Sequence, residues 1–78
     1  MARLLLFGPA REAAGAASAE LPGPTVAAVI SGAERRFGEK LAAVVAVSNI
    51  WLNGVAAELD EQVTDDDEVA VVPPVSGG

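Results

Sequence analysis

Residues 25–38 hold the clearest helical pattern in this 78-residue chain. Thr25 suits a helix N-cap because its hydroxyl oxygen can accept a hydrogen bond from an early backbone N–H, and Gly38 suits the position just past the helix end. Between them, apolar residues recur at helical spacing and form one stripe: Val26, Val29, Ile30, Ala33 and Phe37. Much of the remaining chain consists of short strand-like segments. We therefore expect this helix to pack on a sheet.

Five short segments are typical of strands and are separated by turn residues: 3–7, 17–21, 48–52, 55–59 and 68–72. Asn53-Gly54 is the strongest hairpin signal and joins the third and fourth segments. Asp65–Asp67 marks a turn before the last one. We expect Pro9–Gly15 to be a connection, while residues 39–45 fit either a second short helix or a packed loop. The order predicts an α+β domain, with a mixed sheet of about five strands and one main helix on one face.

Alternation along the strands gives the sheet two apolar faces. The face expected to meet the helix holds Leu4, Leu6, Ile50, Leu52, Val69 and Val71. A register error of one residue would exchange the two sets, but one apolar face would still have no helix on it. We predict that the uncovered face binds a partner protein, through Leu5, Phe7, Trp51, Ala70 and Val72.

The composition disfavours several classes of function. His, Cys and Tyr are absent, so a self-contained hydrolytic or acyl-transfer enzyme lacks the usual base and thiolate, and no Cys–His zinc site can form. The acidic run Asp60–Glu68 lacks the ligand pattern of a calcium loop, and we expect no metal. The net charge of −6 disfavours nucleic acid and anionic membranes as partners. No stretch reaches membrane-spanning length, and we expect a cytoplasmic protein.

The chain ends in Pro73-Pro74-Val75-Ser76-Gly77-Gly78, directly after the last predicted strand. Proline has no N–H for a strand ladder, and glycine has no side chain to pack. We therefore expect residues 1–72 to form the folded domain and residues 73–78 to form an extended, flexible tail. Val75–Gly78, if extended, spans roughly 13 Å, enough to enter a narrow site on another protein. A frayed terminus would have the same composition, so the ending alone leaves both interpretations open.

Several segments together resemble the small, sulfur-carrying subunit of molybdopterin synthase, a ubiquitin-like β-grasp family. Residues 5–15, Leu-Leu-Phe-Gly-Pro-Ala-Arg-Glu-Ala-Ala-Gly, resemble its opening strand and its Arg-Glu-containing loop. Leu52-Asn53-Gly54 falls where the family has a Val-Asn turn. Residues 65–70 correspond to its Asp-Gly-Asp-Glu-Val-Ala, although Asp66 replaces a glycine that would tolerate positive φ and so puts that turn's stability in doubt. Residues 73–78 are similar to its terminal signature, the most specific of these segments.

The resemblance implies a non-catalytic carrier subunit of a sulfurtransferase. The Gly78 carboxylate would be adenylated by an E1-like activating enzyme that uses ATP, and a sulfur donor protein would then supply the sulfur of a thiocarboxylate. Large subunits, in a heterotetramer, would supply the catalytic residues and pass this sulfur to cyclic pyranopterin monophosphate. No bound cofactor is implied. The residues that would thread into the partner's active site are Pro73, Pro74, Val75, Ser76 and Gly77.

Three other interpretations remain open at this point. A related sulfur carrier, for thiazole or cysteine synthesis, would have the same fold and Gly-Gly end, although the Pro73-Pro74 pair and the Arg11-Glu12 loop favour the molybdopterin branch. A ubiquitin-like modifier would use the same terminus to attach to protein lysines. A plain interaction module would not need Gly78 at all.

Overall fold

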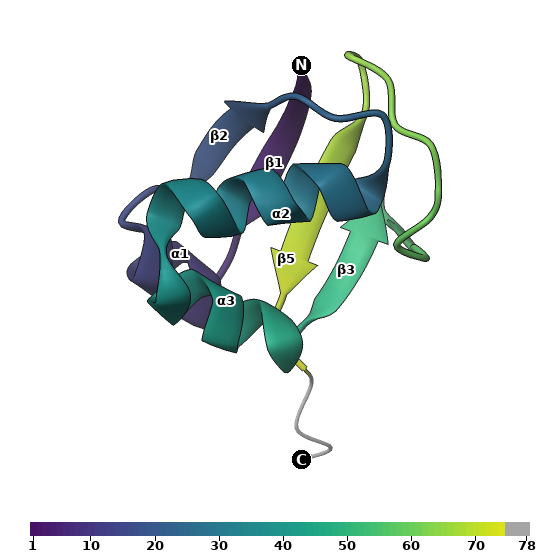
Figure 1. The fold of residues 1–78 in the computed structure, drawn as a ribbon. Coiled ribbons are helices and arrows are strands. Elements are labelled where there is room, and N and C mark those ends of the chain that lie inside the picture. Colours follow the sequence, from purple (N-terminus) through teal and green to yellow (C-terminus); the bar gives the residue numbers. More distant parts are fainter. Residues whose placement is uncertain (75–78) are drawn as a thin grey trace.

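A computed structural model describes residues 1–74 of the chain. The strands form one sheet, and α2 (Val26–Phe37) lies across one face of it, with two shorter helices at the end of the sheet where the last strand finishes (Figure 1). This confirms the predicted α+β layout. The other elements are β1 (Ala2–Leu6), α1 (Pro9–Ala14), β2 (Ser18–Leu21), α3 (Glu39–Ala46), β3 (Asn49–Leu52), β4 (Val55–Ala56) and β5 (Glu68–Val72).

The first and last strands lie side by side at the centre of the sheet. The strand order is β2-β1-β5-β3-β4, and β1 runs parallel to β5, with Leu4 beside Val69 and Leu6 beside Val71. The other neighbouring strands are antiparallel, so the sheet is mixed as predicted. The chain thus returns to its own beginning before it reaches its terminal residues.

The predicted fourth strand, residues 55–59, is too long, because β4 ends at Ala56. The backbone that follows has other partners. Leu59 and Glu61 accept hydrogen bonds, through their carbonyl oxygens, from the N–H groups of Ala27 (2.8 Å) and Val26 (2.9 Å). The first N–H groups of a helix have no partner within it, so this segment satisfies the start of α2 instead of extending the sheet.

Helix α2 follows its predicted pattern. Thr25 is its N-cap, and the Thr25 hydroxyl accepts a hydrogen bond of 3.2 Å from the backbone N–H of Ala28. Gly38 ends the helix with φ of 90°, a conformation that favours glycine. Phe37 is partly buried at the margin of the core, and the rest of the stripe is buried: Val26, Val29, Ile30 and Ala33.

The prediction that Pro9–Gly15 is a connection was wrong, because Pro9–Ala14 forms helix α1. Proline suits the first turn of a helix, where its missing N–H has no intrahelical acceptor. Six residues are too few for an apolar period to stand out, which explains the error. Residues 39–45, which were left open, lie in helix α3, whose Leu41 is fully buried. Helices α1 and α3 pack against each other.

Burial confirms the predicted strand register. Leu4, Leu6, Val69 and Val71, all expected to face α2, are at most 1% exposed. Ile50 and Leu52 are partly buried and pack against the same core. Burial of each such side chain contributes about 1.5–3 kcal/mol, so a shift by one residue would be strongly unfavourable. In residues 1–74, no helix is long and apolar enough to cross a membrane.

The β3–β4 hairpin and the start of β5 are joined by one hydrogen-bond network. Asn53 and Gly54 both have positive φ, 51° and 83°, as a tight two-residue hairpin requires. The Asn53 amide nitrogen donates to an Asp67 carboxylate oxygen (3.0 Å), and the Asn53 amide oxygen accepts from the N–H of Glu68 (2.9 Å). The backbone N–H of Thr64 donates to the second Asp67 oxygen (2.8 Å).

This network lowers the pKa of the Asp67 carboxyl, chiefly through the hydrogen bond from the Thr64 backbone N–H and then through the bond from Asn53. The predicted turn at residues 65–67 is confirmed. In residues 1–74, Asn53 is the only non-glycine residue with positive φ, so Asp66 does not need the glycine that the related family commonly has there.

We expect the free energy of unfolding to depend less on pH, in the acid range, in Asp67→Asn than in wild type. A carboxyl whose folded pKa lies below its unfolded value stabilises the fold above that unfolded value, near 3.8, and the contribution is lost as the pH falls through the folded pKa. The variant should therefore be less stable than wild type at neutral pH and should approach wild type below pH 3.8. Denaturant unfolding measured across this range checks the prediction.

Asp66→Asn is the matched control, since it makes the same change in net charge at the adjacent residue. Asp66 makes no side-chain hydrogen bond within residues 1–74. The same acid dependence in both variants would contradict a specific role for Asp67.

Candidate functional site

The sheet face opposite α2 brings the predicted partner-binding residues together. Leu5 on β1 lies beside Ala70 on β5, and Ala70 lies beside Trp51 on β3, so the three form a row across the sheet. Trp51 is 39% exposed. Phe7 follows β1 on the same side by alternation and is 47% exposed. We call this surface, Leu5, Phe7, Trp51, Ala70 and Val72, the open face.

The open face changes from charged to apolar along β5. On this side of the sheet, β5 begins at Glu68, which pairs with Arg3 at 3.9 Å, and continues through the open-face residues Ala70 and Val72. Both charged side chains are at least half exposed, so their ion pair contributes at most about 1 kcal/mol. The apolar end is the one that leads into Pro73. A partner that covers it therefore contacts the chain immediately before the terminal residues.

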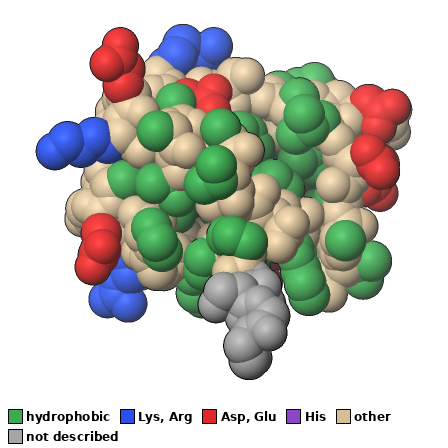
Figure 2. Space-filling model, turned by 90° about the horizontal axis from the view of Figure 1, so that it is seen from below, with side chains coloured by type: hydrophobic (Ala, Val, Ile, Leu, Met, Phe, Trp, Pro, Cys, Tyr) green, Lys and Arg blue, Asp and Glu red, His purple; other side chains and the backbone are tan. Residues whose placement is uncertain are grey.

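The described chain ends beside α1. Pro73 is partly buried and Pro74 is exposed. The N–H of Phe7 donates to the carbonyl oxygen of Val71 (3.3 Å), which extends the β1–β5 ladder to this point. Figure 2 views this end of the molecule and shows hydrophobic side chains spread across it, with charged side chains towards its margins.

The other predicted site residues, Val75, Ser76, Gly77 and Gly78, lie outside the described residues. The structure therefore places the two prolines at the base of the predicted tail.

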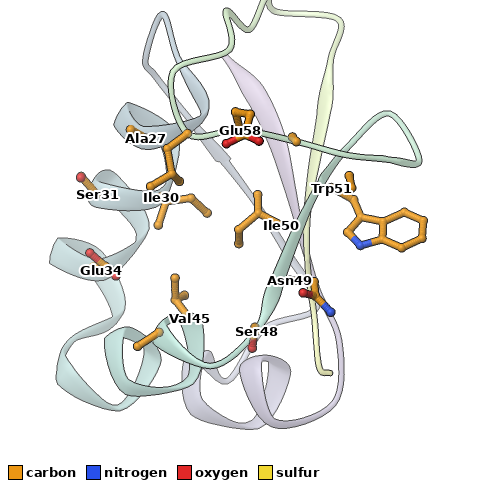
Figure 3. Close-up of a pocket in the computed structure, with 14 residues that line it drawn as sticks. Ala27, Ile30, Ser31, Glu34, Val45, Ser48, Asn49, Ile50, Trp51 and Glu58 are labelled. Carbon is orange, nitrogen blue, oxygen red and sulfur yellow. The ribbon is translucent and has the colours of Figure 1, made fainter. Parts of the chain in front are cut away.

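A groove of about 770 Å³ lies on the α2 side of the sheet and was not predicted from the sequence. Ile30, Val45 and Ile50 point into it, whereas Trp51 points away, towards the open face (Figure 3). Helices α2 and α3 and the segment after β4 form the groove together, and these segments share no sequence pattern that could reveal it.

The groove shows no catalytic arrangement. Its two carboxylates, Glu34 and Glu58, form no ion pair within residues 1–74. The Ser48 hydroxyl donates to the Val44 carbonyl oxygen (2.6 Å), and the chain has no His to activate it. In the described part of the chain, no three acidic side chains are grouped to hold a metal ion.

Sequence reasoning also missed the role of Gly8 and α1 at the base of the tail. Gly8 adopts positive φ, and the Pro73 ring lies against it. The sequence places Gly8 only between the predicted strand at residues 3–7 and the predicted connection at Pro9–Gly15, so its position next to Pro73 had no sequence signal. The contact depends on the parallel pairing of β1 with β5.

Comparisons with known proteins agree with this geometry. The family model described as the ThiS family matches residues 4–78. No curated protein matches the chain.

Three solved structures illustrate the similarity. The putative molybdopterin converting factor, subunit 1, from Pyrococcus furiosus is 32% identical, with a TM-score of 0.80, over 95% of this chain and 97% of that one. SAMP1 from Haloferax volcanii is 30% identical, with a TM-score of 0.80, over 97% of each chain. A chain in the Amycolatopsis orientalis BexX/CysO complex is 25% identical, with a TM-score of 0.83, over 100% of each chain.

The family match spans nearly the whole sequence, and the similar structures share the overall fold of this chain over nearly the full length of both chains. The chain therefore belongs to the ThiS family, and its fold is that of the ubiquitin-like β-grasp sulfur carriers.

Proposed function

We propose that this chain is the small, sulfur-carrying subunit of molybdopterin synthase and acts in molybdenum cofactor biosynthesis. The observation that best supports this is the continuity of the apolar open face, through Val72, with the Pro-Pro-Val-Ser-Gly-Gly sequence of residues 73–78. The 32% identity to the putative molybdopterin converting factor subunit favours this branch of the family. A chain without His or Cys can serve sulfur chemistry if its own terminal carboxylate is the reacting group.

The proposed chemistry begins at the Gly78 carboxylate. A carboxylate is a poor electrophile, so an activating enzyme first joins it to the α-phosphate of ATP, and pyrophosphate leaves. Sulfur at the sulfide level, supplied by a donor protein as hydrosulfide, then attacks the acyl carbon. The C–S bond forms as the bond from the acyl carbon to the AMP oxygen breaks, AMP leaves and the sulfur loses its proton, which produces a thiocarboxylate. Gly77 and Gly78 suit this because enzyme walls can close around a backbone without side chains.

The proposed acceptor is cyclic pyranopterin monophosphate, bound by the large subunit in a heterotetramer. The open face would dock on this subunit and so bring the terminal residues to its active site. Docking fixes the base of the tail, which lowers the conformational entropy that remains to be lost when the tail enters a narrow channel. The catalytic residues belong to the partner, and the expected cytoplasmic location is part of the same proposal.

Two alternatives have specific support. The similarity to a chain of the BexX/CysO complex favours a carrier that serves another sulfur-transfer pathway. The similarity to SAMP1, a small archaeal modifier protein, favours attachment to other proteins. Intact mass distinguishes the sulfur carriers from the modifier, since a thiocarboxylate adds about 16 Da to the chain, whereas a modifier leaves Gly78 in isopeptide linkage to lysines. Sulfur transfer to cyclic pyranopterin monophosphate with the large subunit distinguishes the proposed carrier from one of another pathway.

We expect deletion of Gly77 and Gly78 to abolish sulfur transfer and to leave the melting temperature essentially unchanged. Neither residue has a side chain to pack, whereas the proposal places the reacting carboxylate at Gly78. The measurements are a thermal melt and a sulfur-transfer assay with the activating enzyme, ATP, a sulfur donor and the large subunit.

A chain extended by one alanine after Gly78 is the control, since it keeps every native residue and moves only the carboxylate. It too should be inactive. Transfer retained by the truncated chain would remove Gly78 from the mechanism, and a large fall in melting temperature would show that these residues are structural.

We expect Phe7→Ala to weaken binding to the large subunit much more than it weakens folding. An aromatic residue at an interface centre contributes about 2 kcal/mol or more, which corresponds to roughly a thirtyfold loss of affinity. Phe7 is already 47% exposed in the isolated chain, so its truncation removes little core packing. Calorimetric titration and denaturant unfolding on the same variant check both parts.

Val55→Ala is the matched control. Val55 is 68% exposed but pairs with Leu52, which faces the core side of the sheet, so it lies off the open face. It should leave affinity unchanged. Equal effects of the two substitutions on affinity would contradict docking through the open face.

A further inference from the structure

We propose that Gly8 is a positioning residue for the terminal segment, because it makes room for the Pro73 ring and so sets the direction in which the chain leaves the domain. The inference deepens the proposed carrier function and rests on it: direction matters only if the terminal carboxylate must reach an active site.

Two independent constraints favour glycine at this position. Gly8 has φ of 54° and ψ of −127°, a conformation that L residues with a side chain rarely adopt. A Cβ built at Gly8 would also lie only 3.3 Å from Pro73 Cγ and 3.8 Å from Pro73 Cδ. The proline ring therefore lies directly against the space that a side chain at residue 8 would fill. We call this contact the Pro73 seat.

The Pro73 seat is built from rigid elements. The N–H of Glu12 donates to the Gly8 carbonyl oxygen (3.1 Å), and the N–H of Ala10 donates to the Phe7 carbonyl oxygen (3.1 Å). Ala10 is 1% exposed and belongs to the core. On the other side, the Phe7 N–H holds the Val71 carbonyl oxygen two residues before the proline. The first strand, the first helix and the last strand thus hold Gly8 and Pro73 in contact.

Two consecutive prolines transmit the direction of this contact along the chain. The ring of Pro73 fixes its φ, and Pro74 restricts Pro73 to extended conformations. Such a pair behaves as a short, stiff spacer. A Cβ at residue 8 would contact the Pro73 ring more tightly than an ordinary van der Waals contact, so the ring would have to shift by a few tenths of an ångström. The stiff spacer would change direction with the ring, and atoms further along the chain would move by more than the ring does. Misplacement of a reacting group by about 1 Å can slow a reaction about a hundredfold.

The test measures the first proposed chemical step. ATP–pyrophosphate exchange follows formation of the acyl-adenylate by an activating enzyme, in which the terminal carboxylate bonds to the α-phosphate of ATP and pyrophosphate leaves. For Gly8→Ala we expect kcat to fall at least about tenfold, because the carboxylate is misdirected. KM for the chain should change by less than about threefold, because it depends mainly on docking.

A double-mutant cycle isolates the contact. Pro73→Ala removes Cγ and Cδ, the two ring atoms that face Gly8, and by itself should lower kcat because the stiff spacer loses its seat. In the Pro73→Ala background, Gly8→Ala should then have little further effect on kcat. An equal effect of Gly8→Ala in both backgrounds would overturn the inference. If Gly8→Ala does not fold, the inference is tested by Pro73→Ala alone. An unchanged kcat of ATP–pyrophosphate exchange in Pro73→Ala would then overturn the inference.

Gly38→Ala is the matched control for backbone strain. Gly38 also precedes a helix with positive φ, 90°, but among the described residues nothing lies within 4 Å of a Cβ built there. It should destabilise the fold and leave kcat unchanged. A comparable fall in kcat would show that general destabilisation, and not the Pro73 seat, explains the effect.

Nuclear Overhauser contacts between Gly8 Hα and the Pro73 ring protons test the seat without any activating enzyme. We expect these contacts in wild type, and their absence in wild type would overturn the inference. Wild type that shows these contacts but no exchange with ATP would overturn the proposed function, and the positioning role with it. If wild type and Gly8→Ala were equally active in ATP–pyrophosphate exchange, the positioning role would be overturned and the proposed function would stand.

Discussion

The parallel pairing of β1 with β5 is the constraint on which the rest of the structure depends. Leu4 and Leu6 lie beside Val69 and Val71, and all four are buried against α2. Parallel strands need a long connection, and here almost the whole chain provides it. The pairing therefore closes the domain, and the start of α1 and the end of β5 become neighbours. Without the pairing of β1 with β5, nothing would bring Pro73 close to Phe7 and Gly8.

The same pairing explains why one sheet face remains open. A chain of 78 residues has one long amphipathic helix, and α2 covers one face of the central strands. Helices α1 and α3 pack at the end of the sheet, as Figure 1 shows, and within residues 1–74 no element lies over Leu5, Ala70 and Trp51. A small domain buries a limited share of its apolar surface. Apolar residues that are grouped on an outer face therefore indicate a partner-binding surface more than accidental exposure.

The two ends of strand β5 differ in the kind of contacts that surround them. Near the start of β5, Asn53, Asp67 and Thr64 hold the hairpin and the acidic turn together through charge-assisted hydrogen bonds. Near the end of β5, the contacts are apolar, and the chain passes Gly8 into two prolines. Rigid polar turns thus lie away from the surface proposed for docking. This separation suits the proposed carrier function, in which the domain would have to stay folded while different enzymes act on its terminus.

Sequence alone determined the main helix, the β3–β4 hairpin, the faces of the sheet and the family. Thr25 and Gly38 mark the ends of α2, Asn53-Gly54 marks the hairpin, and strand alternation assigned the buried and open faces, because each of these signals is local and periodic. Helix α1 escaped prediction because its six residues are too few to show an apolar period. The early end of β4 and the groove beside α2 escaped prediction because each arises from contacts between segments far apart in sequence. Only the tertiary structure could place Pro73 against Gly8, because 64 residues separate them and nothing in either segment encodes the pairing of β1 with β5.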